Sequence, residues 1–316
     1  MLVIEQPISQ KSYNLLSEYI RHGQRPKGRK VELKFEADML KAQKIESAID
    51  RLNLDELPQI FSAVDQEQHK SRIPSLSYNQ PNFYWILKNA DLEDWSSDPC
   101  SQVLWLSGPP KCNIDQVSSY VVDVEKKKAS ETQHSVLYFF CLTADTGNPI
   151  VSFTHSLLYQ IVCCSSSNEK AQIVKTFLHS LRDAILGKEQ TSNTTLPRFK
   201  EGDSPNTIIK KVLDAETNGL WSALKAVLDS AHSHDLSIVI DGLDRVKRQK
   251  VEFIREVREL VEHLQGRISK VKALLTSRPE AEIKEVLDGL PCIEYDKERK
   301  GSATPRDSDS KLSSPY

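Results

Sequence analysis

Leu236-Ser-Ile-Val-Ile-Asp-Gly-Leu-Asp244 is the stretch that decides the fold of this chain. A short run of mostly branched apolar residues leads directly to an acidic residue, which is typical of a parallel strand buried on both faces. Open α/β sheets bind ligands at the carboxyl ends of their strands. Asp241 and Asp244 would therefore lie where a magnesium-nucleotide complex could bind. The alternative is that Asp241-Gly242 only turns the chain.

A second stretch, Ser107-Gly-Pro-Pro-Lys-Cys-Asn-Ile-Asp115, lies where a phosphate-binding loop is expected. In G-x-x-x-x-G-K-[ST] the glycines let backbone N–H groups surround the phosphates, the lysine neutralises their charge and the hydroxyl binds magnesium. Counted from Gly108, Asn113 replaces the second glycine, Ile114 the lysine and Asp115 the hydroxyl residue. The Asp115 carboxylate would face the phosphates of a nucleotide. Like charges 4 Å apart repel by roughly 4 kcal/mol at an effective dielectric constant of about 20. The loop therefore predicts poor nucleotide binding.

Some parts of a nucleotide site are still present. Lys111 precedes the lysine position and could reach a phosphate from there, although a solvated loop lysine is the simpler interpretation. Asn113 tolerates the left-handed backbone conformation that a glycine adopts freely. On the acidic strand, Arg245 follows Asp244 in the position of a candidate general base, and a guanidinium cannot accept a proton. The sequence therefore leaves binding open and argues against hydrolysis.

Strands and helices alternate along the chain. Besides the acidic strand, the apolar pattern predicts strands at 103–106, 135–141 and 271–276, and helices at 114–124, 151–162, 170–186, 207–230 and 249–265. Strands separated by helices imply a parallel sheet with helices on both faces, which is the α/β fold class of P-loop NTPases. Trp85, Leu92 and Trp95 lie on adjacent helical turns and are expected to pack in the core.

The two ends differ in composition from the middle. Residues 21–30 contain five Lys or Arg and no acid, which is typical of a solvated linker, with a nuclear address or a phosphate-binding arm as alternatives. Apolar residues repeat at helical spacing over 42–52 and predict an amphipathic helix that packs on the domain. We expect a helical extension with the basic linker at 1–79, the P-loop NTPase-like domain at 80–296 and a disordered, polar tail at 297–316.

Composition excludes several classes of protein. The formal net charge of −2 argues against bulk attraction to nucleic acid. The amino terminus lacks a basic-then-apolar leader, and no apolar run approaches the roughly 18 residues that span a bilayer. The six cysteines lack C-x-x-C spacing and several fall in apolar segments, so they are expected to be reduced core residues. We expect a cytoplasmic protein that binds neither nucleic acid nor membranes.

Six segments occur in the order found in fungal NACHT proteins: residues 84–95, 104–110, 137–141, 156–161, 238–244 and 276–279. The set resembles that family and the nephrocystin-type amino-terminal P-loop domain, within the STAND class of NLR-like switches, over about residues 80–295. In the family the phosphate loop ends in Gly-Lys-Thr or Gly-Lys-Ser and the acidic strand usually in Asp-Glu; this chain departs from both. The resemblance also implies that Arg278 points toward the nucleotide. From the residues alone, Arg278 is a solvated residue at a helix start.

Together these features assign a weak or vestigial nucleotide site to Gly108, Lys111, Asn113 and Arg278, and a vestigial magnesium site to Asp241 and Asp244. No catalytic residue and no required cofactor are assigned. The resemblance implies a switch between an effector and sensor repeats, yet the sequence has no repeats of 20–50 residues.

The leading hypothesis is a non-catalytic NACHT-like interaction or regulatory module, a truncated NLR-like signalling protein. Its partners would be proteins, related NACHT proteins among them. The alternative from the enzyme class is a slow switch that binds ATP or GTP weakly with magnesium through Lys111, Asp241 and Arg278. A third hypothesis is a decaying gene product without a selected activity.

Overall fold

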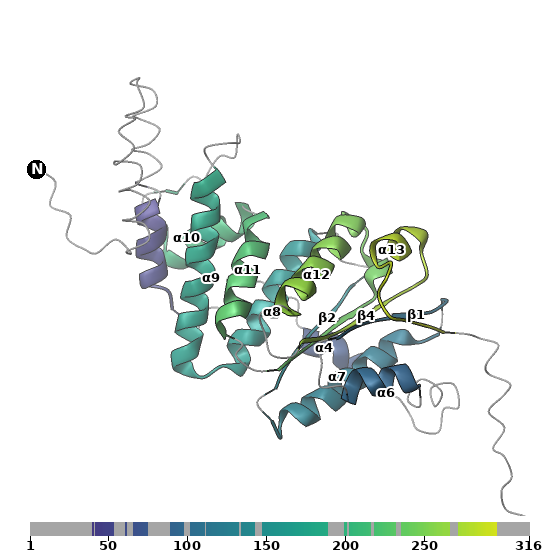
Figure 1. Ribbon diagram of the computed structural model, residues 1–316. Helices are drawn as coiled ribbons and strands as arrows, with labels where there is room; N and C mark the ends of the chain where they lie inside the picture. The colour runs from purple at the N-terminus through teal and green to yellow at the C-terminus, as the bar shows by residue number, and fades with distance from the viewer. Residues whose placement is uncertain are drawn as a thin grey trace, which may run out of the picture.

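The computed structural model describes residues 40, 42–53, 61, 66–74, 89–97, 102–110, 112–132, 134–142, 147–188, 199, 200, 202–215, 218–231, 235–265 and 271–295. Within these ranges the chain forms a sheet with helices on both faces (Figure 1). Lys111, Trp85, the basic segment 21–30 and the tail 297–316 lie outside the described residues.

The sheet has five strands in the order β2-β3-β4-β1-β5, and every recorded pairing is parallel. The strands are β1 (Gln102–Ser107), β2 (Ser135–Phe140), β3 (Leu236–Asp241), β4 (Val271–Ser277) and β5 (Cys292–Glu294). The predicted parallel α/β sheet is confirmed. Because β4 lies between β1 and β3, the loop after β1 and the acidic turn after β3 flank the carboxyl end of β4.

The strand residues alternate between two apolar layers, as the pleat of a strand requires. Leu137 and Ile238 face the larger core, which is formed with α8 (Pro149–Cys164) and α12 (Lys250–Gln265). Tyr138 and Val239 face the smaller core. The helices on that side are α6 (Ala90–Ser97) and α7 (Ile114–Ala129), and they lie on the opposite face of the sheet from α8 and α12 (Figure 1). Leu92 and Trp95 of α6 are buried there, as predicted.

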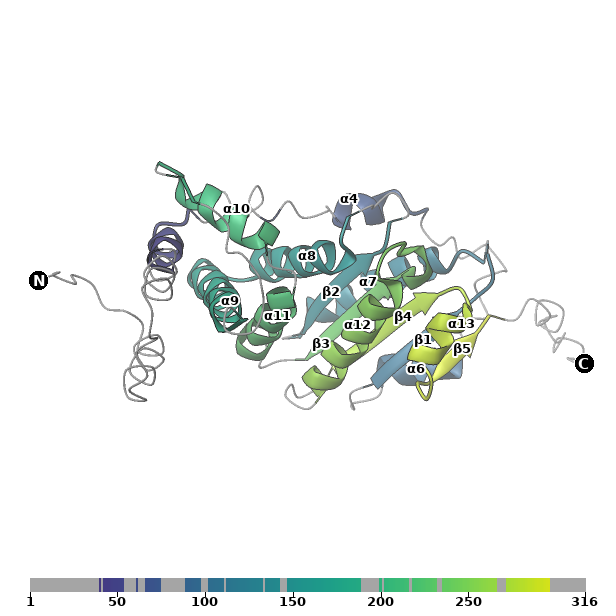
Figure 2. The same cartoon turned by 90° about the horizontal axis from the view of Figure 1, so that it is seen from above.

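A group of helices lies to one side of the sheet, beyond α8 (Figure 2). It contains α9 (Ser167–Lys188), α10 (Pro205–Ala215) and α11 (Asn218–Ala231). The single helix predicted for 207–230 is wrong, because two helices occupy that stretch. Asn218 and Gly219 begin the second one, and both residue types are poor in helix interiors.

The predicted amphipathic helix near the amino terminus is present over residues 42–50. Ile45, Ala48 and Ile49 are buried in the larger core. The polar side of this helix contacts α9, where Arg182 pairs with Glu46. The partner of its apolar stripe is therefore the rest of this chain, as expected from the sequence.

Glutamine side chains cover one edge of the sheet. Phe140 N–H on β2 donates to Gln66 Oε1 of α4 (Gln66–Ser71) at 2.7 Å. Tyr138 N–H donates to Gln160 Oε1 at 3.0 Å, and Gln160 Nε2 returns a bond to the Tyr138 carbonyl at 2.8 Å. Paired edge groups are unavailable to another strand. Neither α4 nor β5 was predicted, because both are too short to give a periodic signal.

Most described cysteines are not core residues, so that prediction is wrong for them. Cys141 is buried, whereas Cys163, Cys164 and Cys292 are exposed. Cys163 and Cys164 end α8, whose apolar middle lies against the sheet. Among the residues that the structure describes, no helix is long and apolar enough to cross a membrane.

Candidate functional site

The carboxyl ends of three neighbouring strands meet at a small cavity of about 150 Å³. The loop that joins β1 to α7, the turn after β3 and the residues after β4 all contribute to its lining. The strand register accounts for this convergence, since Ser107 pairs with Ser277 and Ile240 with Leu275. The cavity brings together the predicted site residues Gly108, Asn113, Asp241, Asp244 and Arg278. Lys111 falls outside the described residues.

Gly108 is closely surrounded in the loop after β1. A Cβ atom there would lie 2.6 Å from Ile114 Cδ1 and 2.7 Å from Cys112 Sγ, so only glycine fits without rearrangement. Its N–H donates to the Ser277 carbonyl at 3.1 Å. The first glycine of the loop is therefore retained for packing, and its N–H is already bonded within the protein.

Asn113 adopts the left-handed conformation, with φ 56° and ψ 38°, immediately before α7. Asparagine is among the few non-glycine residues that do so readily. Ile114, which the motif count from Gly108 places at the lysine position, lies against Gly108 and packs on the smaller core. A hydrocarbon side chain therefore takes the place where a phosphate site needs a cation.

Asp241 is buried at the end of β3, with 1% of its side chain exposed. Its Oδ1 accepts hydrogen bonds from Ser118 Oγ of α7 and Thr276 Oγ1 of β4, both at 2.7 Å. Its Oδ2 lies 3.2 Å from Arg245 Nη1. Burial raises the pKa of the Asp241 carboxyl above its usual range, and Arg245, Thr276 and Ser118 oppose that effect.

Arg245 connects the turn after β3 with the start of α7. The turn contains Gly242 and the short helix η2 (Leu243–Arg245). Arg245 Nη2 lies 3.8 Å from Asp115 Oδ2, in addition to the contact of Nη1 with Asp241. Gly242 has φ 75°, and a Cβ atom on it would lie 2.9 Å from Arg245 Cδ and 3.2 Å from Cζ. The glycine therefore provides both the turn and the space for the arginine.

Asp244, the second predicted magnesium ligand, pairs with another arginine. Its Oδ1 accepts the backbone N–H of Arg278 at 3.0 Å, and its Oδ2 lies 3.2 Å from Arg278 Nε. The Asp244 side chain is 7% exposed and that of Arg278 is 54% exposed. The ion pair thus lies at the rim of the cavity, whereas the contact of Asp241 with Arg245 is buried on its carboxylate side.

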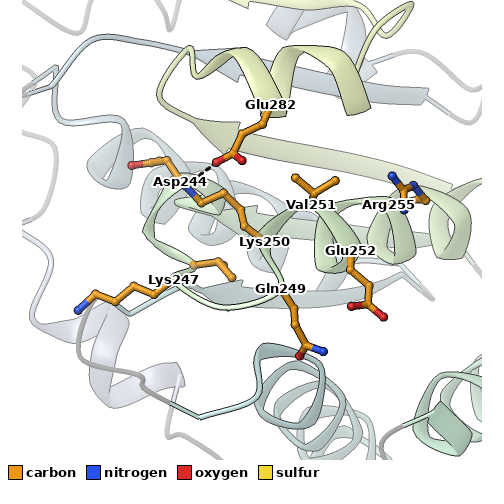
Figure 3. Close-up of a pocket in the computed structure, with 9 residues that line it drawn as sticks. Asp244, Lys247, Gln249, Lys250, Val251, Glu252, Arg255 and Glu282 are labelled. Atoms are coloured by element: carbon orange, nitrogen blue, oxygen red, sulfur yellow. Dashed lines mark ion pairs between the residues drawn. The ribbon is translucent and has the colours of Figure 1, made fainter.

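A wider and more open pocket of about 650 Å³ lies on the other side of Asp244, between the start of α12 and α13 (Ala281–Val286) (Figure 3). Lys250 crosses part of it and pairs with Glu280 at 2.6 Å and with Glu282 at 3.2 Å. Its lining mixes positive and negative side chains. A lining with charges of both signs does not select a ligand of either charge.

Several contacts at the site were missed by reasoning from the sequence. Arg245 was recognised only as a residue that cannot act as a base, and its pairing with Asp115 was not predicted. Ser118 and Thr276, the hydrogen-bond partners of Asp241, were not singled out either. One signal was available for Ser118, because it lies one helical turn after Ile114 and therefore on the same side of α7.

A comparison with known protein families gives a match. The family model described as nephrocystin 3, N-terminal, matches residues 83–196 and 161–278, which together cover more than half of the chain. No curated protein and no solved structure matches the chain. The chain therefore belongs to the nephrocystin 3 N-terminal family.

Proposed function

We propose that this chain is a non-hydrolysing, NACHT-like interaction or regulatory module with a degenerate phosphate loop. The observation that carries the proposal is the pairing of both acidic residues of the candidate site with arginines. Asp241 contacts Arg245, and Asp244 contacts Arg278. Neither carboxylate is left to bind a metal ion with its full negative charge.

The residues present do not fit a magnesium ion in this arrangement. Mg²⁺ requires near-ideal octahedral coordination by oxygen atoms. A nitrogen atom of Arg245 lies 3.2 Å from Asp241 Oδ2, and the positive guanidinium would repel the metal. Within the described part of the chain, no group of three or more His, Cys, Asp or Glu residues is arranged to hold a metal ion.

The phosphate side of the site fits a nucleotide no better. Ile114 supplies no charge, Asp115 is an anion, and the N–H of Gly108 already bonds to Ser277. Small-molecule pockets usually measure roughly 300–1,000 Å³. The cavity of about 150 Å³ would have to open before a nucleoside triphosphate could enter.

The alternative of a weak ATP or GTP switch is favoured by one observation. The Arg278 side chain is 54% exposed at the cavity rim and could turn toward a phosphate. This alternative requires the Asp241 and Asp244 ion pairs to separate when a magnesium nucleotide binds. It therefore predicts nucleotide binding that depends on Asp241.

Protein partners are the remaining part of the proposal, with related NACHT proteins as the first candidates. Among the described residues, Leu40 is the only exposed large hydrophobic side chain. Contacts made by this part of the chain would therefore be mainly polar.

Recovery of partners from a cell extract should be the same with and without millimolar ATP and magnesium. A ligand shifts a conformational equilibrium only through its differential affinity for the two states, and a site that hardly binds ATP supplies almost none.

Hydrolysis is expected to be absent, because the lysine, the metal-binding hydroxyl and the base are replaced together at Ile114, Asp115 and Arg245. A steady-state phosphate-release assay with ATP and GTP should give the buffer background. Turnover above background that is lost in Asp241→Ala would establish the enzyme alternative. The loss of turnover in Asp241→Ala is required, because turnover by a contaminating ATPase would not respond to that substitution.

The reverse variant Ile114→Lys/Asp115→Ser should bind ATP more tightly than the wild type. It restores a cation for the phosphates and removes an anion, and each favourable contact of about 1.4 kcal/mol gives a tenfold gain. Isothermal titration should therefore show a gain of at least about tenfold. An unchanged affinity in a folded variant would mean that the cavity, rather than the charges, excludes the nucleotide.

A further inference from the structure

We propose that Arg245 is a tethered cation that takes the place of a divalent metal ion between Asp241 and Asp115. Without its charge, these carboxylates would form an oxygen-ligand site that binds such an ion. The inference rests on the proposed function, because it names what holds the site together when no nucleotide binds. Asp115 stands where the phosphate-loop motif carries a neutral hydroxyl.

The guanidinium of Arg245 lies between carboxylates from different elements. Its Nη1 lies 3.2 Å from Asp241 Oδ2, and its Nη2 lies 3.8 Å from Asp115 Oδ2. Asp241 comes from β3 and Asp115 from the first turn of α7. A cation at this point therefore joins the loop after β1 to the turn after β3.

Among the residues that the structure describes, Asp241 Oδ2 has no partner besides Arg245. Ser118 and Thr276 both donate to Oδ1, and no described group hydrogen-bonds to Oδ2, which is fully buried. A buried carboxylate oxygen needs a compensating charge or donor. Among the described residues, the positive charge next to this oxygen comes from Arg245.

The main chain holds Arg245 in place. The Arg245 N–H donates to the Gly242 carbonyl at 2.8 Å, and the Gly242 N–H donates to the Thr276 carbonyl at 3.1 Å. The arginine stem lies against Gly242, where any larger residue would displace it. The turn thus fixes the cation on the carboxylates, as a bound metal ion would be fixed by its ligands.

Arg278 provides a matched contrast within the same cavity. It also pairs with a carboxylate at 3.2 Å, but its side chain is 54% exposed and its partner is Asp244. Its removal leaves Arg245 on Asp241, so the Asp241 carboxylate keeps its cation. A metal ion should therefore distinguish the loss of Arg245 from the loss of Arg278.

The test uses the full chain and Mn²⁺, which prefers oxygen ligands and can be followed by its paramagnetism. The wild-type melting temperature should not respond to 1 mM Mn²⁺. Arg245→Met should melt lower, and the same Mn²⁺ should raise its melting temperature by about 3 °C if the ion binds with a Kd near 0.1 mM. Electron paramagnetic resonance should count about one bound Mn²⁺ per chain.

Three further variants decide the assignment. Arg278→Met should show no Mn²⁺ response, Arg245→Lys should behave as the wild type, and Arg245→Met/Asp115→Asn should lose most of the response. Absence of a response in Arg245→Met, or an equal response in Arg278→Met, would overturn the proposal. Failure of Arg245→Met to fold even with 5 mM Mn²⁺ would also count against it, because the ion should replace the guanidinium.

The two proposals can fail separately. Turnover of ATP by the wild type would remove the proposed function and leave the Mn²⁺ result on Arg245→Met unchanged. A wild type without turnover, combined with an Arg245→Met variant that ignores Mn²⁺, would keep the proposed function and remove the tethered cation.

Discussion

Glu125→Gln is expected to lower the free energy of unfolding by up to about 3 kcal/mol at pH 7. Glu125 lies in α7 on the smaller-core side, and its side chain is 3% exposed. Its carboxylate accepts hydrogen bonds from Lys128 at 2.8 Å, from Ser237 at 2.8 Å and from Ser96 at 3.2 Å. His134 Nε2 lies 3.4 Å away. A neutral amide cannot replace a carboxylate among so many donors.

The pKa of Glu125 gives this prediction a pH dependence. Burial raises the pKa, but hydrogen bonds from His134, Lys128 and Ser237 outweigh that effect and lower it to about 2. A carboxyl with a lowered pKa in the folded state contributes stability above its ordinary pKa of 4.5. That stability is lost as the pH falls from about 4.5 to about 2.

Urea unfolding of the wild type and Glu125→Gln at several pH values measures this contribution. The two curves of stability should converge as the pH falls below 4.5. Glu131→Gln is the control, because Glu131 is exposed just after α7. A constant difference between the wild type and Glu125→Gln from pH 7 to pH 3 would show that the charge of Glu125 is not what stabilises the fold.

Arg245→Met is expected to lower the free energy of unfolding by about 3 kcal/mol at pH 7, because it leaves the buried Asp241 carboxylate without its cation. The same substitution should cost less than about 1 kcal/mol in an Asp241→Asn background, where no buried charge remains. The difference between the two costs is the coupling energy of the pair, which a double-mutant cycle measures directly. Equal costs in both backgrounds would show that Arg245 acts through packing alone.

The cost of Arg245→Met should change with pH in the same direction as that of Glu125→Gln, although the carboxyl responsible is Asp241. Burial raises the pKa of Asp241, and removal of Arg245 would raise it further. A carboxyl with a raised pKa in the folded state costs nothing below its ordinary pKa, and the cost grows as the pH rises through the folded value. The free energy of unfolding of Arg245→Met should therefore be close to that of the wild type near pH 4 and lower than it toward pH 7.

The main elements of the fold could be predicted because their patterns are long. The apolar run that ends at Asp241 and the aromatic run over 135–140 both predicted buried parallel strands. The structure pairs these two strands as neighbours. The break between α10 and α11 involves only a few residues, and a periodic apolar pattern does not reveal so short an interruption. β5 forms only three pairs with β1, and no local pattern distinguishes so short a strand.

The site could be predicted in position but only partly in its contacts. The order of strands and loops was enough to expect the loop after β1 beside the acidic turn after β3. The ion pair of Arg245 with Asp115 joins residues 130 positions apart by sequence number. From the sequence, each residue was interpreted alone. Arg245 was interpreted as a residue that cannot act as a base, and Asp115 as an anion in the hydroxyl position. Their opposite charges become meaningful only when the fold places them together.

The most direct test of this account is isothermal titration of the wild type with ATP in the presence of magnesium. We expect no saturable binding up to about 1 mM, because arginines pair with both acidic residues and Ile114 stands where the motif has a lysine. Saturable binding at micromolar concentration that is lost in Asp241→Ala would contradict it.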